Sequence, residues 1–163
     1  MRSDVNDPLF NIQDGNQRSK GIEAEILANP VQGWSMVFGY GYNDSKFEKA
    51  AQDVEGRRPQ GSGPKNTFNF WTNYTFSSTA LKGFGLGFSA NYASESYAIS
   101  LTPDGDFIVP AYLLLGSHFT YDTKRYRLGI KINNLTNEKY WMGWTNLIPQ
   151  MPRQLVATVG IKF

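Results

Sequence analysis

The sequence predicts an all-β fold of antiparallel, up-and-down strands, and three features predict it. Apolar and polar residues alternate with a period of two in segment after segment, and no stretch shows the three-and-four spacing of an amphipathic helix. The 163 residues include 11 Phe, 9 Tyr and 4 Trp while only 18% are charged, which is the reverse of a disordered composition. The connections between the alternating segments are short and long in turn.

Seven segments carry the alternation, and in each of them one set of positions is uncharged. The segments cover residues 22–28, 34–43, 68–76, 84–93, 112–121, 126–133 and 154–163. Because successive side chains of a strand point to opposite faces, each segment predicts a strand with an apolar and a polar face. The charged residues all fall in the polar set: Glu23, Glu25, Arg127, Lys131 and Lys162.

The connections distinguish a membrane barrel from a soluble sandwich, since both have one apolar face. The short connections span 29–33, 77–83 and 122–125, and the long ones span 45–63, 93–109 and 134–151. Outer-membrane barrels have short periplasmic turns and long extracellular loops, whereas a Greek-key sandwich has no reason for such regularity. We therefore predict a transmembrane β-barrel segment of seven full strands, with a possible further stub at 8–13.

The uncharged set is predicted to face lipid. Its central members are Phe38, Phe70, Phe88, Leu115, Ile130 and Val159. Aromatic residues gather at both ends of the strands, as in the two girdles of membrane barrels. They are Trp34, Phe76, Phe84, Tyr121, Tyr126 and Phe163 on the short-turn side, and Tyr42, Phe68 and Tyr92 on the other.

Composition excludes several other classes of protein. No apolar run approaches the roughly 18 residues that a transmembrane helix needs. The 16 basic and 14 acidic residues are too evenly balanced to predict a nucleic-acid surface. With no cysteine and one histidine, His118, neither a thiolate site nor a His-based metal site is expected. We expect no catalytic residues, no metal, no bound cofactor and no enzymatic activity.

A series of short motifs, in order, resembles one family. They are Lys20-Gly21-Ile22-Glu23-Ala24-Glu25; Pro30 with Gly33-Trp34; Pro64-Lys65-Asn66-Thr67 with Trp71 and Tyr74; Val109-Pro110-Ala111-Tyr112; and Asn133-Asn134-Leu135-Thr136-Asn137 with Tyr140, followed by Pro152-Arg153 and a strand ending in Phe163. In order and spacing they resemble the C-terminal barrel part of TonB-dependent outer-membrane receptors of the ferric-siderophore type.

The resemblance implies a barrel of about 22 strands, plugged by an N-terminal domain, in the bacterial outer membrane. Such receptors take up ferric siderophores with energy delivered by the TonB complex. Residues 1–163 would be the C-terminal portion, without the plug domain and the TonB box. The start of the chain carries no signal sequence, so we expect a truncated or partial chain.

Five loop residues are candidates for contact with the transported ligand. Arg57 and Arg58 could attract an anionic ferric chelate, or could be a solvated charge pair. Tyr140, Trp141 and Trp144 could stack against a chelate, or could anchor in the outer headgroups.

The last strand resembles the signal that the barrel-assembly machinery reads, with Val159, Ile161 and Phe163 at alternate positions. The other interpretation of Phe163 is a buried strand end.

Two alternatives remain open at this point. One is a self-contained eight-stranded outer-membrane barrel that uses 8–13 as a strand, either an adhesin or a small lipid-modifying enzyme. The other is a soluble carbohydrate-binding β-sandwich with Trp71, Trp141 and Trp144 as platforms.

Overall fold

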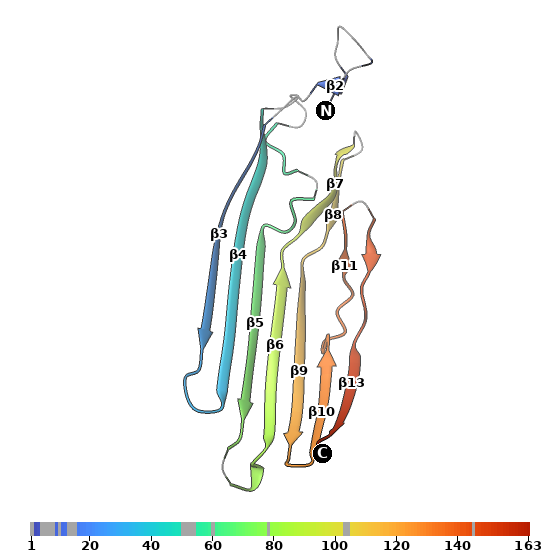
Figure 1. Ribbon diagram of the computed structural model, residues 1–163. Coiled ribbons are helices and arrows are strands. Elements are labelled where there is room, and N and C mark those ends of the chain that lie inside the picture. Colours follow the sequence, from blue (N-terminus) through green and yellow to red (C-terminus); the bar gives the residue numbers. More distant parts are fainter. Residues whose placement is uncertain are drawn as a thin grey trace.

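The computed structural model describes most of the chain. The described residues are 2–3, 9, 11–12, 16–49, 55–59, 61–77, 79–102, 105–144 and 146–163. The main element is one antiparallel sheet in the order β13-β10-β9-β6-β5-β4-β3 (Figure 1). Its strands are β3 (Asn16–Ala28), β4 (Trp34–Lys49), β5 (Asn66–Thr75), β6 (Phe84–Ala93), β9 (Tyr112–Asp122), β10 (Tyr126–Asn133) and β13 (Gln154–Ile161).

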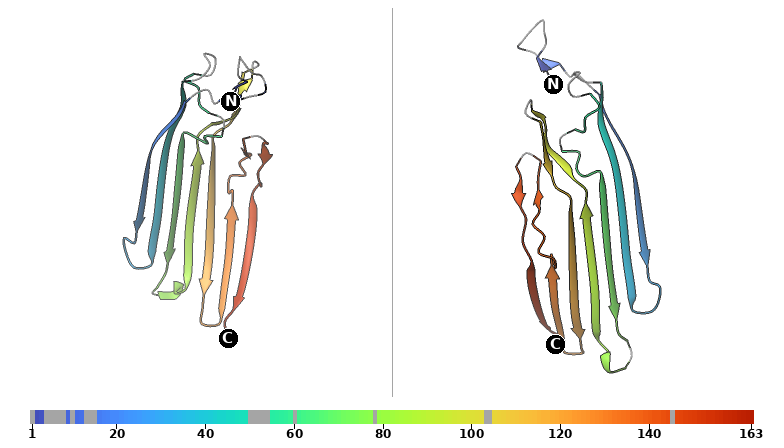
Figure 2. Two further views of the ribbon diagram at one scale, coloured as in Figure 1. Left: turned by 45° about the horizontal axis from the view of Figure 1, so that its top comes forward. Right: turned by 180° about the vertical axis from the view of Figure 1, so that it is seen from behind.

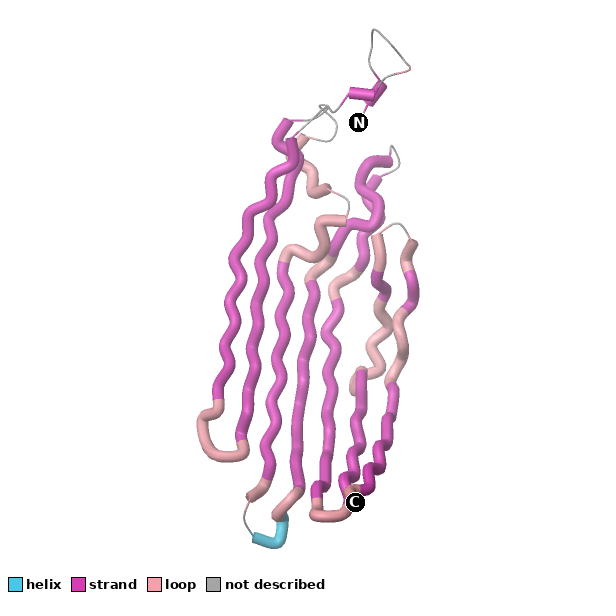
Figure 3. Tube along the Cα trace, in the orientation of Figure 1, coloured by secondary structure: helices cyan, strands magenta, loops and turns pink. Residues whose placement is uncertain are grey.

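Short and long connections lie at opposite ends of this sheet, as the sequence predicts. Figure 1 shows the short turns near the C-terminus and the long connections near the N-terminus. The turn before β6 contains a single 3-10 turn, η1 (Thr79–Leu81), which is cyan in Figure 3. Two long connections form hairpins of their own, which are β7 (Ser96–Thr102) with β8 (Gly105–Val109), and β11 (Trp141–Met142) with β12 (Ile148–Pro149).

In the part of the chain that is described, no helix is long and apolar enough to cross a membrane.

The strand register places the predicted apolar residues on one face. Directly paired residues of neighbouring strands have side chains on the same side of a sheet. The pairs include Ile26–Phe38, Phe38–Phe70, Phe70–Ala90, Ala90–Leu115, Phe88–Ser117, Phe119–Ile130 and Leu128–Val159. We call this side the apolar face and the opposite side the polar face. One continuous apolar face therefore extends across all seven strands.

The apolar face is not covered by a second layer of described residues. The views in Figure 2 show the sheet as a single curved layer. Ile130 is 49% exposed and Val159 is 71% exposed, and the buried hydrophobic residues are only Ala90, Ala93, Ala98 and Val109 within the described ranges. A soluble sandwich would bury its apolar face under a second sheet. The arrangement therefore does not support the sandwich alternative.

The predicted stub at 8–13 does not join the large sheet where it is described. Its residues Asn11–Ile12 form β2, which pairs with β1 (Arg2–Ser3) as a separate two-stranded sheet. Pro8, Phe10 and Gln13 lie outside the described residues. The edges of the large sheet are β3 and β13, which do not pair with each other. The described strands therefore give no eighth strand and no closed barrel.

The first hairpin extends further than its alternation predicts. β3 begins at Asn16 rather than at residue 22, and β4 continues to Lys49. Apart from Phe47 the added residues are polar or glycine on both faces, because this part of the hairpin projects beyond the apolar region, and so they carry no period-two signal. At the other end of the chain, β13 ends at Ile161, and Phe163 follows the strand as a fully exposed residue.

Candidate ligand-binding site

The connection between β4 and β5 is held against the polar face of the first hairpin. Asn43 is at the centre of this contact: its Oδ1 accepts hydrogen bonds from Ser19 Oγ at 3.0 Å and Ser45 Oγ at 2.7 Å. Its Nδ2 donates to the carbonyl oxygen of Ser62 at 3.0 Å. Ser45 is only 4% exposed. These contacts fix the end of the connection relative to two strands.

Arg58 strengthens the same attachment. Its guanidinium donates to the carbonyl oxygen of Asn43 at 2.8 Å, that of Gly63 at 3.1 Å and that of Pro64 at 3.3 Å. Carbonyl oxygens satisfy part of the hydrogen-bonding capacity of a guanidinium without neutralising its charge. Arg58 therefore organises the loop at this end of the hairpin.

A basic hollow of about 570 Å³ lies beside this arginine. Among the described residues that line it, the cationic ones are Lys46, Arg57, Arg58 and Lys65, and the acidic ones are Asp44 and Glu95. Lys65 Nζ lies 5.5 Å from the centre of the Tyr42 ring, within the range of a cation–π contact. The predicted pair Arg57 and Arg58 thus lies in a larger group of cations that favours an anionic ligand.

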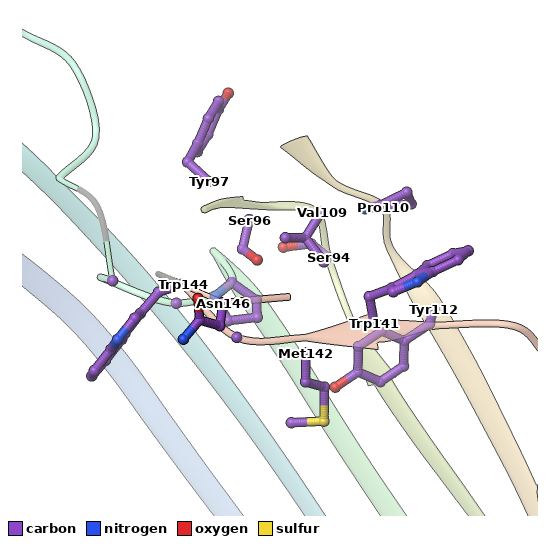
Figure 4. A pocket seen from close by; sticks show the side chains of 14 residues that line it. Ser94, Ser96, Tyr97, Val109, Pro110, Tyr112, Trp141, Met142, Trp144 and Asn146 are labelled. Carbon is purple, nitrogen blue, oxygen red and sulfur yellow. The ribbon is translucent and has the colours of Figure 1, made fainter. Parts of the chain in front are cut away.

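An aromatic hollow of about 390 Å³ lies next to it, beyond the long-loop ends of β5, β6 and β9. Figure 4 shows Trp141 and Trp144 on opposite sides of this hollow, with Met142 between them. Trp141 is 41% exposed and Trp144 is 61% exposed. None of the described residues that line the hollow is charged. It can therefore accommodate a flat or aliphatic uncharged group.

Close packing positions Trp144 against the first long loop. Gly61 has a φ of +76°, and a Cβ added there would lie 2.9 Å from Cε3 of the Trp144 ring. The indole therefore lies directly on the Gly61 backbone. The last long loop and the first long loop, more than 80 residues apart in the chain, contact each other here.

Tyr140 connects the last long loop to the polar face of the sheet. Its ring centre lies 4.7 Å from that of Tyr112, and Tyr112 pairs with Ala93 on the polar face. The Tyr140 side chain is partly buried by this stacking. Of the three predicted aromatic residues, Trp141 and Trp144 line the aromatic hollow, whereas Tyr140 supports its wall through Tyr112.

Two asparagines close the base of the last long loop. Asn134 has a φ of 53°, its Nδ2 donates to the carbonyl oxygens of Glu138 at 2.8 Å and Met151 at 3.3 Å, and its Oδ1 accepts from the Glu138 amide at 2.7 Å. Asn137, with a φ of 58°, accepts a hydrogen bond from the Arg153 amide at 2.9 Å. Asparagine tolerates this left-handed backbone better than most residues. The 133–137 motif therefore has a clear structural role.

The two hollows share Ser94 and Tyr97, which precede and begin the β7–β8 hairpin. The sequence indicates neither residue, because this connection shows no regular alternation and lies far from the other loops in the chain. Met142 as a lining residue and Gly61 as a packing position were not predicted either. Only the adjacency of Met142 to two tryptophans could have indicated it.

The polar wall below the hollows contains His118. The His118 ring stacks on Trp71, with ring centres 6.1 Å apart, and its Nε2 lies 3.0 Å from Oδ1 of Asn73. No group of three or more His, Cys, Asp or Glu side chains that could hold a metal ion occurs in the described part of the chain.

The residues of the predicted barrel-assembly signal lie at the opposite end of the sheet. Val159 pairs with Leu128, and Phe163 lies beyond the last strand.

Comparison with known proteins identifies the family. The family model described as "TonB dependent receptor-like, beta-barrel" matches residues 2–135, which is most of the chain. The chain belongs to the TonB-dependent receptor β-barrel family. Barrels of this family are bacterial outer-membrane proteins, so the short turns of the sheet are periplasmic and the long loops are extracellular.

Curated relatives of this TonB-dependent receptor barrel are siderophore receptors. The chain is 26% identical to the "Ferrichrome outer membrane transporter/phage receptor" of Escherichia coli (strain K12), and the match covers 100% of this chain and 22% of the relative. It is also 26% identical to the "Ferrioxamine B receptor" of Salmonella typhimurium (strain SL1344), over 85% of this chain and 20% of the relative. The chain therefore spans about a fifth of the length of these relatives.

Solved structures show the same fold. The closed form of the ferric-catecholate import receptor Fiu from E. coli K12 aligns with a TM-score of 0.80 at 19% identity, over 99% of this chain and 23% of that chain. P. aeruginosa FpvA bound to a heterologous pyoverdine aligns with a TM-score of 0.74 at 22% identity, over 88% of this chain and 19% of that chain. The fold of this chain thus superposes on about a fifth of each of these longer receptor chains.

Proposed function

We propose that residues 1–163 are the C-terminal portion of an outer-membrane receptor of about 22 strands that takes up ferric siderophores with TonB-coupled energy. The names of the relatives support this function, since they are transporters and receptors of ferric siderophores rather than enzymes. The plug domain and the TonB box would lie in a part of the receptor outside these residues. Contact with the TonB complex would be made through those parts.

The observation that carries the proposal is the adjacency of the two hollows at the extracellular end. Three long loops bring uncharged aromatic surface and a group of cations together above the polar face of the barrel wall. A ferric chelate presents both uncharged organic surface and charge. The loops would capture the chelate, and it would pass along the polar face into the barrel when TonB displaces the plug.

The apolar face would contact the lipid of the outer membrane. Phe38, Phe70, Phe88, Leu115, Ile130 and Val159 lie on this face through the strand register. The final residues would have a separate role during assembly. Val159 and Ile161 are exposed on the edge strand β13 and Phe163 is exposed just beyond it, where the barrel-assembly machinery would recognise them before the barrel closes.

Substitution of the two tryptophans tests the ligand site. In the full-length receptor, Trp141→Ala and Trp144→Ala should each weaken binding of a recognised ferric siderophore by about 10-fold, because each removes a large contact surface. The names of the relatives make ferrichrome and ferrioxamine B the first probes. Binding to intact cells is measured with radioactive iron in the chelate.

Trp34→Phe is the matched control, since Trp34 lies on the apolar face at the periplasmic end. It should leave the affinity unchanged. If both alanine variants bind the ferric siderophore with unaltered affinity, the aromatic hollow is not the ligand-binding site. Failure of the complete receptor to bind or import any ferric chelate would contradict the function itself.

A further inference from the structure

We propose that the periplasmic end of the sheet binds the phosphate groups of anionic phospholipids through a basic strip made of Lys82, Lys124 and Arg125. The inference rests on the proposed contact of the apolar face with membrane lipid. It goes beyond that contact by naming a lipid class and the residues that select it.

Charge is distributed unequally between the two ends of the sheet. The described residues at the short-turn end, within 29–33, 76–83, 122–127 and 162–163, carry five cationic side chains and a single acidic side chain, that of Asp122. The whole chain has 16 basic and 14 acidic residues. The periplasmic end therefore holds a clear excess of positive charge in a chain that is otherwise almost neutral.

The acidic side chain of Asp122 already has two cationic partners. Asp122 Oδ2 accepts a hydrogen bond from Arg127 Nε at 2.8 Å and forms an ion pair with Nη2 of the same guanidinium at 2.7 Å, and Oδ1 pairs with Lys162 Nζ. Lys82, Lys124 and Arg125 are exposed and form no ion pair within the described part of the chain. One negative charge thus orders two cations, and three more remain available to an external anion.

Backbone hydrogen bonds hold the cations in neighbouring positions. The Asp122 amide donates to the Gly83 carbonyl oxygen at 2.8 Å, which joins the turn that carries Lys82 to the β9–β10 turn. The Lys162 amide donates to the Arg125 carbonyl oxygen at 2.8 Å, which joins that turn to the end of β13. The strip therefore crosses three successive strand ends, and its backbone is ordered before any ligand binds.

The aromatic girdle places the strip at the level of lipid headgroups. Phe84 and Tyr121 pack with ring centres 4.4 Å apart on the apolar face, and Tyr126 beside them is 51% exposed. Aromatic rings of membrane barrels lie at the boundary between acyl chains and headgroups. Lysine and arginine side chains one or two residues further along extend into the headgroup layer, where phosphates lie. Several basic residues together favour anionic over zwitterionic lipids.

Lipid retention by the full-length receptor tests the proposal. The purified receptor is incubated with equal amounts of dioleoyl phosphatidylglycerol and dioleoyl phosphatidylcholine, and bound lipids are counted by native mass spectrometry. The unaltered receptor should retain phosphatidylglycerol preferentially. The triple variant K82Q/K124Q/R125Q should lower the ratio of bound phosphatidylglycerol to phosphatidylcholine by about 10-fold or more.

The matched control removes the same charge from the extracellular end. K20Q/K49Q/K139Q replaces three exposed lysines there and should keep the preference. An unchanged ratio in the periplasmic variant, or an equal loss in both variants, would overturn the proposal. The charge-retaining variant K82R/K124R/R125K should behave like the unaltered receptor, which separates charge from folding.

The outcomes also separate this proposal from the one on which it rests. If the unaltered receptor retains both lipids equally, the basic strip does not select anionic lipids, while the lipid-facing orientation of the apolar face stands. If it retains neither lipid, the orientation of the apolar face fails as well.

Discussion

Two glycines fix the geometry of the short turns. Gly33 and Gly83 have φ values of +85° and +89°, and their carbonyl oxygens accept hydrogen bonds from the amides of Thr75 and Asp122, both at 2.8 Å. A Cβ at either position would collide with the carbonyl oxygen of that same partner residue. These two positions therefore require glycine for its backbone conformation and for close approach.

Gly83→Ala should lower the free energy of unfolding of the full-length receptor by roughly 1–3 kcal/mol, because it adds a collision to a strained backbone. Urea unfolding in lipid vesicles measures the change. Gly56→Ala is the control: Gly56 has a φ of +79°, but a Cβ there would meet nothing within 4 Å. The control should therefore lower the free energy of unfolding by less. Equal decreases in the two variants would show that the contact with Asp122 is unimportant.

Asn134 is a second residue on which local structure depends. It is 7% exposed, and its amide group makes three hydrogen bonds that close the last long loop. Asn134→Ala should lower the free energy of unfolding by roughly 1–3 kcal/mol, since it leaves buried backbone groups without a hydrogen-bond partner. Thr136→Ala, at an exposed position of the same turn, should be nearly neutral in the same unfolding measurement. Similar losses for both variants would contradict the role of the Asn134 amide.

The strands and their faces could be predicted from the sequence because lipid on one side requires an uncharged residue at every second position. Phe88 and Ala90, for example, alternate with Gly87, Ser89 and Asn91, and they pair in register with Thr72 and Phe70. The β11–β12 hairpin was not predicted because each of its strands has only two residues, and the β7–β8 hairpin was not predicted because its residues show no regular alternation. The extension of β4 to Lys49 was missed because it lies beyond the apolar region.

The two faces of β6 provide a test at the scale of the element. Phe88→Arg should destabilise the receptor by about 2–4 kcal/mol, because a cation would enter the lipid-facing side near the middle of the membrane. Asn91→Arg, on the polar face, should have a small effect because the new charge can stay hydrated. Refolding into lipid vesicles at increasing urea compares the two variants. Equal tolerance at both sites would contradict the orientation of the sheet.

The open edges of the sheet determine how the molecule as a whole can exist in a membrane. β3 and β13 are edge strands, and each unpaired backbone group in hydrocarbon costs several kcal/mol. Residues 1–163 alone should therefore not refold in detergent or lipid to a heat-modifiable, protease-resistant monomer, whereas the full-length receptor should. Recovery of such a monomer would instead support a self-contained barrel.

The candidate site could be predicted only in part. Trp141 and Trp144 are conspicuous in the sequence because they are aromatic residues in a loop, and both line the aromatic hollow. Tyr97 and Gly61 carry no comparable signal, since their importance comes from contacts between loops that are distant in the chain. Arg58 was expected to act on a ligand, and its contacts with carbonyl oxygens add a structural role that no sequence pattern indicates.

The clamp formed by Asn134 and Asn137 has an evolutionary consequence. It joins the two ends of the last long loop through Met151 and Arg153, so the segment between them begins and ends at a fixed separation. Such a segment can be exchanged or lengthened as a cassette without changing how the flanking strands pair. A lineage of receptors could thus acquire a new cargo by replacing residues 138–150 while it inherits the barrel wall intact.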